Sequence, residues 1–599
     1  MCGIAGCVER PGRRPDRGAL ERMAAALAHR GPDGDGIAID ANVGLVHRRL
    51  AIVDPSEAGR QPMSGGGWTV TYNGEVFNHL ELRERLPGAA WRGGSDTETL
   101  VEALGAWGED AVPRLNGLFA FAALQRARGR LLLVRDRLGV KPLYYARHAG
   151  ALWFASEQRA LLAAGVPARV RADVARHAVV PGWVNGEATP LAGIFRLPPG
   201  TLADVDLETL ELRPRRWWRP SSVVDEGRAA ALAGASRREQ ADAVEDALRV
   251  AVRRRLMADV RVGTLCSGGL DSALITLFAA EAQPGLLAVN ASIVDQPHVD
   301  EGPWARRVAS RAGAELHTVE VTGESFRAGL VRTVEHHEYP LVHPGSVPMV
   351  ELAALARTHG AKVLLSGEGA DELFGGYEWL DPVASRLFAA RGSPFALARA
   401  VAAAARRRRP RSDPPPEVVA RFEDAARRDA REAYAHHRGV RRRLETALAG
   451  DLELYLSHLL NRQDKCTMAS SVETRVPFLD PDVIGLALNL PLEARLEPRR
   501  KGVLRDVVRR HFGDALADRP KLGFGFDTRS LIEARADPAF LHDGRLREVL
   551  GTPRAEWVHG LRVMPDAWAL PVWTAEIWCR LMVDGESRAD VESALWSGA

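Results

Sequence analysis

Short apolar runs separated by glycine, asparagine and aspartate dominate the first 210 residues of the chain. Runs with the length and the bounding turn residues of strands lie at 43–53, 68–72, 118–124, 131–134 and 152–154. Two longer stretches, 20–29 and 97–107, have helical spacing, and Asp96 stands where the second helix needs an N-cap. Strands outnumber helices in this half, so we expect layered sheets with helices on their outer faces.

The pattern changes after residue 210. Pro214, Pro220, Ser221 and Ser222 favour a linker over 211–239. Helical stretches then alternate with short buried runs, which predicts a doubly wound parallel sheet. These runs lie at 261–266, 286–293, 315–319 and 362–365, and the chain from about 377 is helical in pattern. We predict an α/β protein of two domains, an αββα sandwich over 1–210 and a parallel-sheet domain with a helical extension over 240–599.

One segment of the second domain, 385–445, is rich in alanine and arginine and contains four consecutive arginines at 406–409. A nucleic-acid patch is one interpretation. Solvated helices around a loop are favoured, because acidic residues return at once and no aromatic residues interleave. We expect no nucleic-acid partner, and the role of the segment stays open.

Length and composition narrow the class of protein. A chain of 599 residues is too long for one hydrophobic core, and its net charge of +3 gives no global basic field. No run of 18 apolar residues predicts a membrane span, and the N-terminus lacks the pattern of a secretory signal. The 5 cysteines are far apart, without disulfide or metal-ligand spacing. We therefore expect a cytoplasmic protein.

Cys2 is the first candidate for chemistry. Removal of Met1, which is normal before a small residue, leaves Cys2 with a free α-amine whose ordinary pKa is about 8. That amine can serve as base for the thiol, as in N-terminal threonine nucleophiles. Asn73 and the backbone N–H of Gly74 can donate to a developing oxyanion, although Asn-Gly is also a common hairpin turn.

Three charged residues among the strands suit a glutamine substrate. Arg49 can hold an α-carboxylate in a bidentate pair, and Glu75 and Asp96 can each hold an α-ammonium group. Arg49 and Asp96 also have plainer interpretations, because both could be surface charges and Asp96 could be only a helix cap.

Seven motifs in a fixed order resemble the glutaminase domain of the glutamine-hydrolysing asparagine synthetase family. The resemblance covers nearly all of 1–210 and implies an N-terminal-nucleophile hydrolase. It implies that Cys2 is the nucleophile, that Asn73 and Gly74 form the oxyanion hole, and that the three charged residues bind glutamine. The motifs are M-C-G-I-A-G, H-R-G-P-D, H-R-R-L-A-I-V-D, Y-N-G-E-V-F-N, G-S-D-T-E, G-L-F-A-F-A and R-D-R-L-G-V-K-P-L-Y.

Two glycine-rich loops follow apolar strands in the second half. The first, V-G-T-L-C-S-G-G-L-D-S (262–272), lacks the lysine of a typical ATPase phosphate loop but offers backbone N–H groups and a helix N-terminus to phosphates. The second is L-L-S-G-E-G-A-D-E-L-F-G-G-Y (364–377). Asp271, Asp371 and Glu372 place carboxylates beside the presumed phosphates, which suits Mg²⁺, although acidic residues at helix N-termini are common without an ion.

With D-K-C-T-M-A-S-S-V-E-T-R-V-P-F-L-D (464–480), Lys501 and D-R-P-K-L-G-F-G (518–525), these loops resemble the synthetase domain of the same family. The resemblance implies that an acceptor carboxylate attacks the α-phosphate of ATP, giving an acyl-adenylate and pyrophosphate, and that ammonia then displaces AMP. It implies Lys521 at the adenylation step, Glu368 as the base for ammonia attack, and Asp271 and Asp371 as metal ligands. The implied nucleotide-binding residues are Leu265, Ser267, Gly268, Gly269, Asp271, Ser272, Ile293, Ser366 and Gly367.

The acceptor stays open at this stage. The segment H-H-E-Y-P-L-V-H-P-G-S-V-P-M (336–349) does not match the pattern expected of aspartate-specific members, so a natural-product acid is as acceptable as aspartate. A β-lactam-forming cyclase is disfavoured because Cys2 and Glu368 are both present. A glutaminase with a nucleotide-binding regulatory domain remains the simpler alternative. The sequence also leaves the oligomeric state open, a homodimer included.

Overall fold

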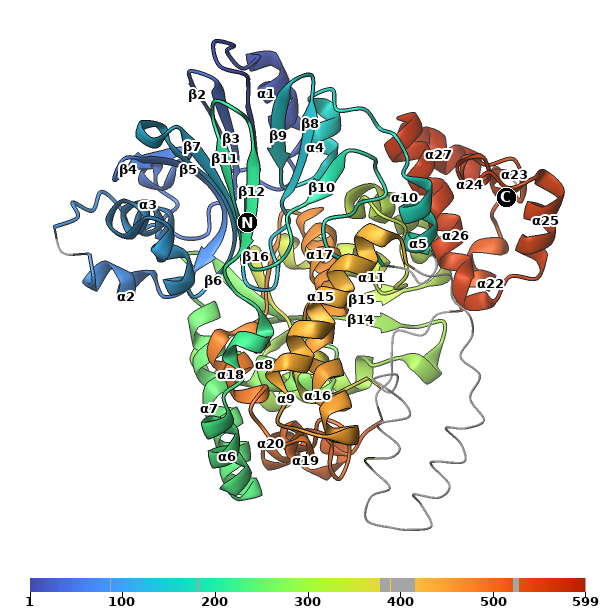
Figure 1. The fold of residues 1–599 in the computed structure, drawn as a ribbon. Coiled ribbons are helices and arrows are strands. Elements are labelled where there is room, and N and C mark those ends of the chain that lie inside the picture. The colour runs from blue at the N-terminus through green and yellow to red at the C-terminus, as the bar shows by residue number, and fades with distance from the viewer. Residues whose placement is uncertain (87, 180–182, 378–387, 389–414, 521–526, 598–599) are drawn as a thin grey trace.

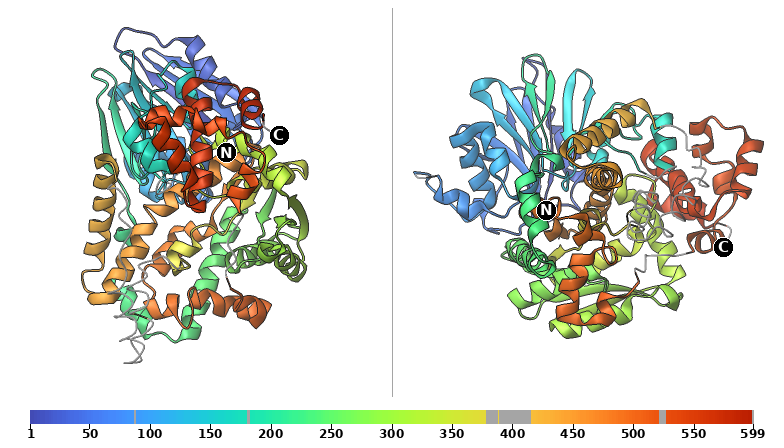
Figure 2. Two further views of the ribbon diagram at one scale, coloured as in Figure 1. Left: turned by 90° about the vertical axis from the view of Figure 1, so that its right-hand side faces the viewer. Right: turned by 60° about the horizontal axis from the view of Figure 1, so that its bottom comes forward.

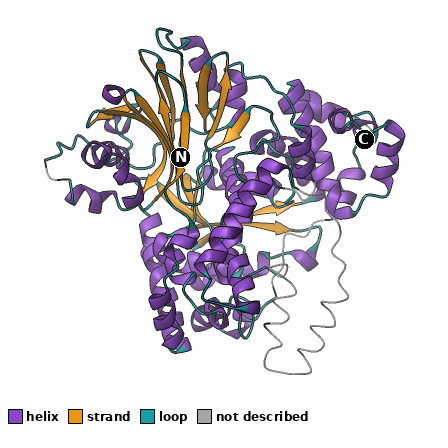
Figure 3. Cartoon of the chain, in the orientation of Figure 1, coloured by secondary structure: helices purple, strands orange, loops and turns teal. Residues whose placement is uncertain are grey.

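The computed structural model describes residues 1–86, 88–179, 183–377, 388, 415–520 and 527–597. Its N-terminal strands form two stacked sheets, and a third sheet runs through the helical remainder (Figures 1 and 3). The C-terminal helices, among them α26 (Asp566–Trp578) and α27 (Arg588–Leu595), pack on α10 (Gly323–His337), which Figure 1 labels beside them. In the right-hand view of Figure 2 these helices, coloured red, gather on one side of the molecule. None of the described helices combines the length and the apolar character needed to cross a bilayer.

The first domain contains two six-stranded antiparallel sheets. The first has the order β10-β8-β9-β1-β3-β2. Its strands are β1 (Gly3–Val8), β2 (Gly34–Asp40), β3 (Val43–Arg49), β8 (Tyr144–His148), β9 (Ala151–Ala155) and β10 (Ile194–Arg196). The second has the order β12-β11-β7-β6-β5-β4. Its strands are β4 (Met63–Gly65), β5 (Trp68–Val76), β6 (Gly117–Gln125), β7 (Arg130–Arg135), β11 (Thr201–Asp206) and β12 (Leu212–Arg216).

Helices cover the outer faces of this pair, which confirms the predicted αββα sandwich. The inner faces meet through apolar residues such as Ile4 and Leu45 from one sheet and Ala122 and Leu133 from the other. Helix α1 (Arg17–Ala26) packs on β1 and β3, and α3 (Asp96–Trp107) packs on β4 and β5. The inner strands β1, β9, β6 and β7 are therefore buried on both faces, whereas the edge strands β2 and β12 are partly exposed.

The N-cap of α3 is not the predicted residue. The Ser95 hydroxyl accepts from the backbone N–H of Glu98 at 3.2 Å and caps the helix, while Asp96 is the first helical residue. The Asp96 carboxylate instead points towards β5, where it is available to the site described below.

The second domain is built on a five-stranded parallel sheet, as predicted, with the order β15-β14-β13-β16-β17. Its strands are β13 (Arg261–Leu265), β14 (Leu287–Ile293), β15 (Glu315–Val321), β16 (Ala361–Leu365) and β17 (Glu473–Arg475). Successive residues of β14 face opposite cores: Ala288 faces the side of α7 (Arg237–Arg255) and α8 (Leu270–Ala282), and Leu287 faces α11 (Ser346–Thr358). The inner strands β13, β14 and β16 are thus buried on both sides, which explains their continuous apolar runs, whereas the edge strand β15 is partly exposed.

The predicted linker has more regular structure than its composition suggested, and the described part of the alanine- and arginine-rich segment is helical, which was the favoured interpretation. Within 211–239 lie β12, which pairs with β11, then α6 (Glu226–Gly234) and the first turn of α7. In 385–445 the described part contains α15 (Glu417–Ala433) and the start of α16 (Gly439–Asp451). The four arginines at 406–409 lie outside the described residues.

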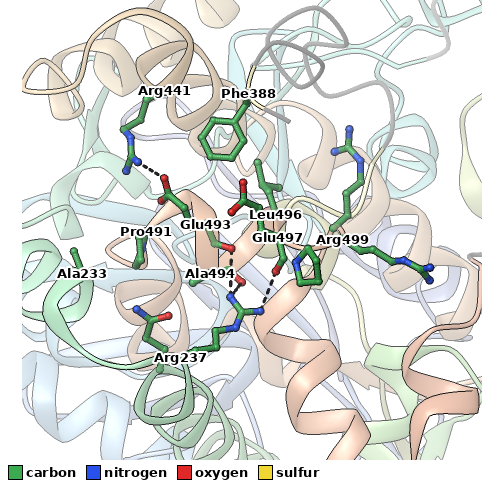
Figure 4. Close-up of a pocket in the computed structure, with 13 residues that line it drawn as sticks. Ala233, Arg237, Phe388, Arg441, Pro491, Glu493, Ala494, Leu496, Glu497 and Arg499 are labelled. Atoms are coloured by element: carbon green, nitrogen blue, oxygen red, sulfur yellow. Dashed lines mark hydrogen bonds and ion pairs between the residues drawn. The ribbon is translucent and has the colours of Figure 1, made fainter. Parts of the chain in front are cut away.

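A cavity of about 1070 Å³ between α7, α16 and α19 (Leu492–Leu496) contains several arginines (Figure 4). Arg237 donates to the carbonyl oxygens of Ala494 and Glu497 at the end of α19, at 2.7 and 3.1 Å, and Arg441 pairs with Glu493. These guanidinium groups satisfy helix carbonyls and a carboxylate, so they close α19 against its neighbours.

Candidate functional site

The buried side chain of Cys2 stands at the start of β1, beside Asn73 on β5. The backbone nitrogen of Cys2 donates to Asn73 Oδ1 at 3.0 Å, and Asn73 Nδ2 is buried with no hydrogen-bond partner in the described part of the chain. Burial raises the pKa of the Cys2 thiol. The thiol is therefore neutral until a base removes its proton, and an unused amide donor lies next to it.

Gly74 follows Asn73 in a conformation that requires glycine. Its φ is +155°, and an added Cβ would lie 2.2 Å from the Leu118 carbonyl oxygen and 2.7 Å from Phe119 Cα. The backbone of β5 thereby approaches β6 closely at the residue after Asn73.

Two neighbouring carboxylates are buried around β5, Glu75 on the strand itself and Asp96 at the start of α3. Asp96 Oδ2 accepts from the Tyr72 hydroxyl and the Val76 backbone N–H, both at 2.8 Å, while burial raises the pKa of Asp96 to about 6. Burial and the Asp96 charge raise the pKa of Glu75 well above its usual value, and Glu75 Oε2 has no hydrogen-bond partner among the described residues. A buried acidic pair of this kind favours a cationic ligand between the two groups.

The guanidinium of Arg49, the third predicted glutamine contact, uses part of its hydrogen-bonding capacity on the loop that follows β3. Its guanidinium donates to the carbonyl oxygens of Asp54 and Ser56 at 2.5 and 2.8 Å. Asp54 in turn accepts from the Gly94 N–H at 2.7 Å, two residues before Asp96. The carbonyl oxygen of the next residue, Leu50, lies 3.9 Å from Cys2 Sγ. The backbone beside Arg49 therefore borders the site around Cys2.

The chain's first residue reaches the second domain. The Met1 ammonium lies 3.1 Å from Glu473 Oε2 on β17, with both groups buried. Arg475 on the same strand pairs with Glu473 at 2.5 Å and lies 3.6 Å from Glu75 Oε1, and its carbonyl oxygen accepts from the Ser366 N–H at 2.9 Å. The three residues of β17 therefore connect the Cys2 side with the second glycine-rich loop.

That second loop lines a cleft of about 1150 Å³ at the carboxyl ends of the parallel strands. The predicted nucleotide residues that line it are Leu265, Ser267, Asp271, Ser272, Ser366 and Gly367. Gly268 has φ +70° and approaches α9 (Gly302–Ala312) so closely that a Cβ would lie 2.5 Å from Ala305 N, and Gly269 precedes α8. Ile293 is buried at the end of β14, while Val289, Asn290 and Ala291 of that strand line the cleft.

The predicted metal ligands converge on one cation. Lys501 Nζ lies 2.5 Å from Asp271 Oδ2 and 2.7 Å from Asp371 Oδ1. Burial alone would lower the pKa of Lys501, but the two carboxylates hold it above its usual range. Two carboxylates close enough to share an ammonium also fit the oxygen preference of Mg²⁺.

Glu372, the other acidic residue of this loop, does not join them. Its carboxylate is buried and accepts from the Tyr377 hydroxyl at 2.8 Å, and burial raises its pKa to about 8. The carboxyl group of Glu372 is therefore held by Tyr377, apart from the Asp271–Lys501–Asp371 cluster.

Glu368 lines the cleft and pairs with Arg462 of α17 (Tyr455–Met468), with Oε1 and the guanidinium 2.9 Å apart. Lys521 lies outside the described residues. The nearby Arg519 donates to the Gly268 carbonyl oxygen and pairs with Glu301, which fixes the end of the segment that leads to Lys521.

Sequence reasoning missed several residues that the structure brings into these sites. Arg462 and Glu473 lie in or next to the motif at 464–480, but only their partners across the fold show what they do. Arg30 was present in the H-R-G-P-D motif, yet nothing local showed that its Nε donates to the Cys2 carbonyl oxygen at 3.1 Å.

The comparisons agree with this arrangement. The family described as "Glutamine amidotransferase domain" matches residues 1–218, and the family described as "Asparagine synthase" matches 243–568. A putative glutamine-hydrolysing asparagine synthetase of Mycobacterium tuberculosis is 31% identical over 586 residues, covering 89% of each chain. Asparagine synthetase 3 of Bacillus subtilis is 29% identical, over 87% of this chain and 86% of that protein.

Among solved structures, the glutamine phosphoribosylpyrophosphate amidotransferase of B. subtilis is 16% identical and covers 53% of this chain and 81% of its own, with a TM-score of 0.28 that is too low for a comparison of folds. The two family matches span most of the chain in the order of the two candidate sites. The chain belongs to the glutamine-hydrolysing asparagine synthetase family, whose members are ligases with a glutamine amidotransferase domain.

Proposed function

We propose that this protein hydrolyses glutamine at Cys2 and uses the ammonia to amidate a carboxylate that it has first activated with ATP. AMP and pyrophosphate are the second products. The observation that carries the proposal is the position of β17, which touches the Cys2 side through Glu473 and the cleft through the Arg475 carbonyl. The names of the relatives make aspartate the first acceptor to test, with related amino-acid-like or natural-product acids next.

Glutamine hydrolysis begins when Met1 is removed and the Cys2 nitrogen becomes an amine. This nitrogen already donates to Asn73 Oδ1, which would orient the amine beside its own thiol. The amine takes the thiol proton, the sulfur attacks the amide carbon, and the oxyanion accepts from Asn73 Nδ2 and the Gly74 N–H. The proton passes to the leaving nitrogen, ammonia departs, and water then hydrolyses the thioester to glutamate.

Charge complementarity selects the substrate of this step. Glu75 and Asp96 provide the buried negative charge that an α-ammonium group needs, and Arg49 provides the positive charge for the α-carboxylate. Arg475, 3.6 Å from Glu75, offsets part of the cost of burying the two acids, and the ammonium group of bound glutamine offsets more of it.

Removal of Met1 also opens space towards the second domain. Met1 belongs to an apolar cluster that includes Leu50, Phe77 and Leu118 from the first domain and core residues of the second. The space vacated by its side chain would be bounded by these residues and by Glu473. Neutral ammonia can cross an apolar passage, whereas the charged ammonium ion would have to lose its hydration at a large cost in free energy. The ammonia therefore reaches the cleft unprotonated, in its nucleophilic form.

The cleft suits adenylation. The first glycine-rich loop and the start of α8 present backbone N–H groups to pyrophosphate, next to the hydroxyl groups of Ser267 and Ser272. Asp271 and Asp371 would hold Mg²⁺, with Lys501 as their partner in its absence. When bound, the ion neutralises phosphate charge. Lys521 would add positive charge where the acceptor oxygen attacks the α-phosphate.

Glu368 is the proposed base for the last step. Its pairing with Arg462 directs the carboxylate into the cleft. It would take a proton from the ammonia nitrogen as that nitrogen attacks the acyl carbon and AMP leaves.

The test measures products under glutamine, ATP, Mg²⁺ and a panel of carboxylic acids that begins with aspartate. The proposal predicts AMP and pyrophosphate in equal amounts only when an accepted acid is present. The matched control is Cys2→Ala with added ammonium, which should give the same products without glutamate. Glutamine hydrolysis with no AMP under any acid would favour a regulatory role for the second domain.

A further inference from the structure

The turn before β2 holds the nucleophile by its backbone. Arg30 is fully buried, and its Nε donates to the Cys2 carbonyl oxygen at 3.1 Å. An arginine in this position fixes the direction in which the first peptide units leave β1, and with it the place of the thiol and the amine.

Two carboxylates from different domains hold the Arg30 guanidinium. Glu157, before α4 (Gln158–Ala163) of the first domain, accepts from it at 2.8 Å. Asp464, on α17 of the second domain, lies 2.9 Å from it on another nitrogen. Burial alone would lower the pKa of Arg30, but Asp464 and Glu157 hold it above its usual range. The orientation of the guanidinium therefore depends on both domains.

The ion pair with Arg30 accounts for the buried charge of Asp464. It is 2% exposed, and in the described part of the chain Arg30 is its one ion-pair partner and neither carboxylate oxygen has a hydrogen-bond partner. A buried carboxylate is tolerated when a cation balances it. Separation of Asp464 from Arg30 would leave a buried charge without a counter-ion, so the pair holds the two domains in contact at this point.

The helix that carries Asp464 also reaches the cleft. Arg462, two residues earlier on α17, pairs with Glu368, and Ser471 after the helix donates to the His29 carbonyl oxygen at 2.6 Å. Helix α17 therefore contacts both Glu368, the proposed base for ammonia attack, and Arg30, and the residues just after the helix contact His29.

We propose that Asp464 is a positioning residue for glutamine hydrolysis, supplied by the synthetase domain to hold Arg30 on the Cys2 carbonyl. The glutaminase site is incomplete without α17, so its rate depends on the state of the other domain. This inference rests on the proposed role of Cys2 but not on the identity of the acceptor.

The test is Asp464→Asn in the full chain. Displacement of a reacting group by about 1 Å costs about 10²-fold in rate, so kcat for glutamine hydrolysis should fall by that order. The KM for glutamine should change by less than about threefold, because the glutamine-binding carboxylates are untouched. Pyrophosphate release with added ammonium should stay within about twofold of the wild-type rate, since the cleft keeps Arg462 and Glu368.

The control is Asp506→Asn, which makes the same chemical change at a partly exposed aspartate inside the second domain, where Asp506 pairs with Arg237 at 2.5 Å and Arg509 at 3.1 Å. It should leave glutamine hydrolysis unchanged. A second readout is alkylation of Cys2 by a chloroketone analogue of glutamine, which Asp464→Asn should slow in proportion to kcat.

A double-mutant comparison covers the case in which Asp464→Asn alone disturbs folding. Arg30→Gln with Asp464→Asn removes both charges of this pair, and Glu157 keeps Arg159 as a partner at 3.2 Å, so neither buried carboxylate position is left with an unbalanced charge. Its glutamine kcat should equal that of Arg30→Gln. The proposal is wrong if Asp464→Asn hydrolyses glutamine within about twofold of wild type, or if it lowers kcat further in the Arg30→Gln background. Absence of ammonium-dependent activity in wild type would instead contradict the proposed synthetase function and leave this comparison of glutaminase rates intact.

Discussion

Replacement of Asp96 by asparagine should separate glutamine binding from stability. The Asp96 carboxylate is buried, and Oδ2 accepts from the Tyr72 hydroxyl and the Val76 N–H. An asparagine Oδ1 in the same place can accept both bonds, but it carries no charge for the glutamine ammonium. Loss of a hydrogen bond between charged groups costs about 1.5–3 kcal/mol, so the KM for glutamine should rise by about 10–100-fold.

The same change should not destabilise the protein. The difference between a pKa of about 6 in the folded protein and 3.8 for the ordinary group corresponds to at most about 3 kcal/mol of unfavourable free energy at neutral pH. A raised acid pKa means that the folded state binds the proton more tightly, so wild type loses this stability as pH rises from about 4 to 6. The amide introduced by Asp96→Asn has no such proton, so the variant should melt at or above the wild-type temperature at pH 7. Its advantage should shrink as the pH falls towards about 4 to 5.

Thermal unfolding followed at several pH values measures this difference, with about 2–4 °C expected per kcal/mol in a domain of this size. Asp96→Ala is the matched control, because it leaves the Tyr72 hydroxyl and the Val76 N–H without an acceptor and should melt below wild type. The reasoning fails if Asp96→Asn melts well below wild type at pH 7, or if its KM for glutamine is unchanged.

Three further predictions use other parts of the two sites. Mass spectrometry of active protein should show Met1 absent, and Cys2→Ala should lose all glutamine hydrolysis but retain ammonium-dependent activity; retention of Met1 in active enzyme would refute the nucleophile. Tyr72→Phe removes a hydrogen bond that lowers the pKa of Asp96, so the rise in the KM for glutamine at acid pH should begin at a higher pH than in wild type; an unchanged profile would contradict the role of Asp96. Lys501→Ala removes the ammonium that shares Asp271 and Asp371 with Mg²⁺, so it should lower the Mg²⁺ concentration needed for half-maximal pyrophosphate release while glutamine hydrolysis continues; a parallel loss of both activities would contradict a role confined to the cleft.

Much of the fold follows from local sequence pattern. The alternation and length of apolar runs predicted both sheet systems, because strands buried on one or two faces leave direct signatures. The strand β17 gave no such signature, since three residues rich in charge form a strand only because β16 offers a buried edge beside them. The cap of α3 was also not decided by local sequence, because serine and aspartate are equally good N-caps and Ser95 and Asp96 are adjacent. The hydrogen bond from β5 to the Asp96 carboxylate leaves Ser95 as the cap.

The candidate sites divide in the same way. Residues that act through the backbone or within one loop, such as Gly74 and the glycines before α8, could be found from motifs. Residues that act across the domain boundary could not, because Met1 meets Glu473 and Arg30 meets Asp464 over more than 400 positions of sequence. The packing of α17 and β17 against the first domain brings these pairs together, and no local pattern encodes it.

The most direct test of the account follows an oxygen atom. An acid that supports pyrophosphate release is supplied with ¹⁸O in its carboxyl group, together with glutamine, ATP and Mg²⁺, and the AMP is analysed by mass spectrometry. An acyl-adenylate predicts that one ¹⁸O atom appears in each AMP formed, in step with the amide product. Unlabelled AMP, or ADP and phosphate in place of AMP and pyrophosphate, would contradict the proposed activation and with it the use of the ammonia made at Cys2.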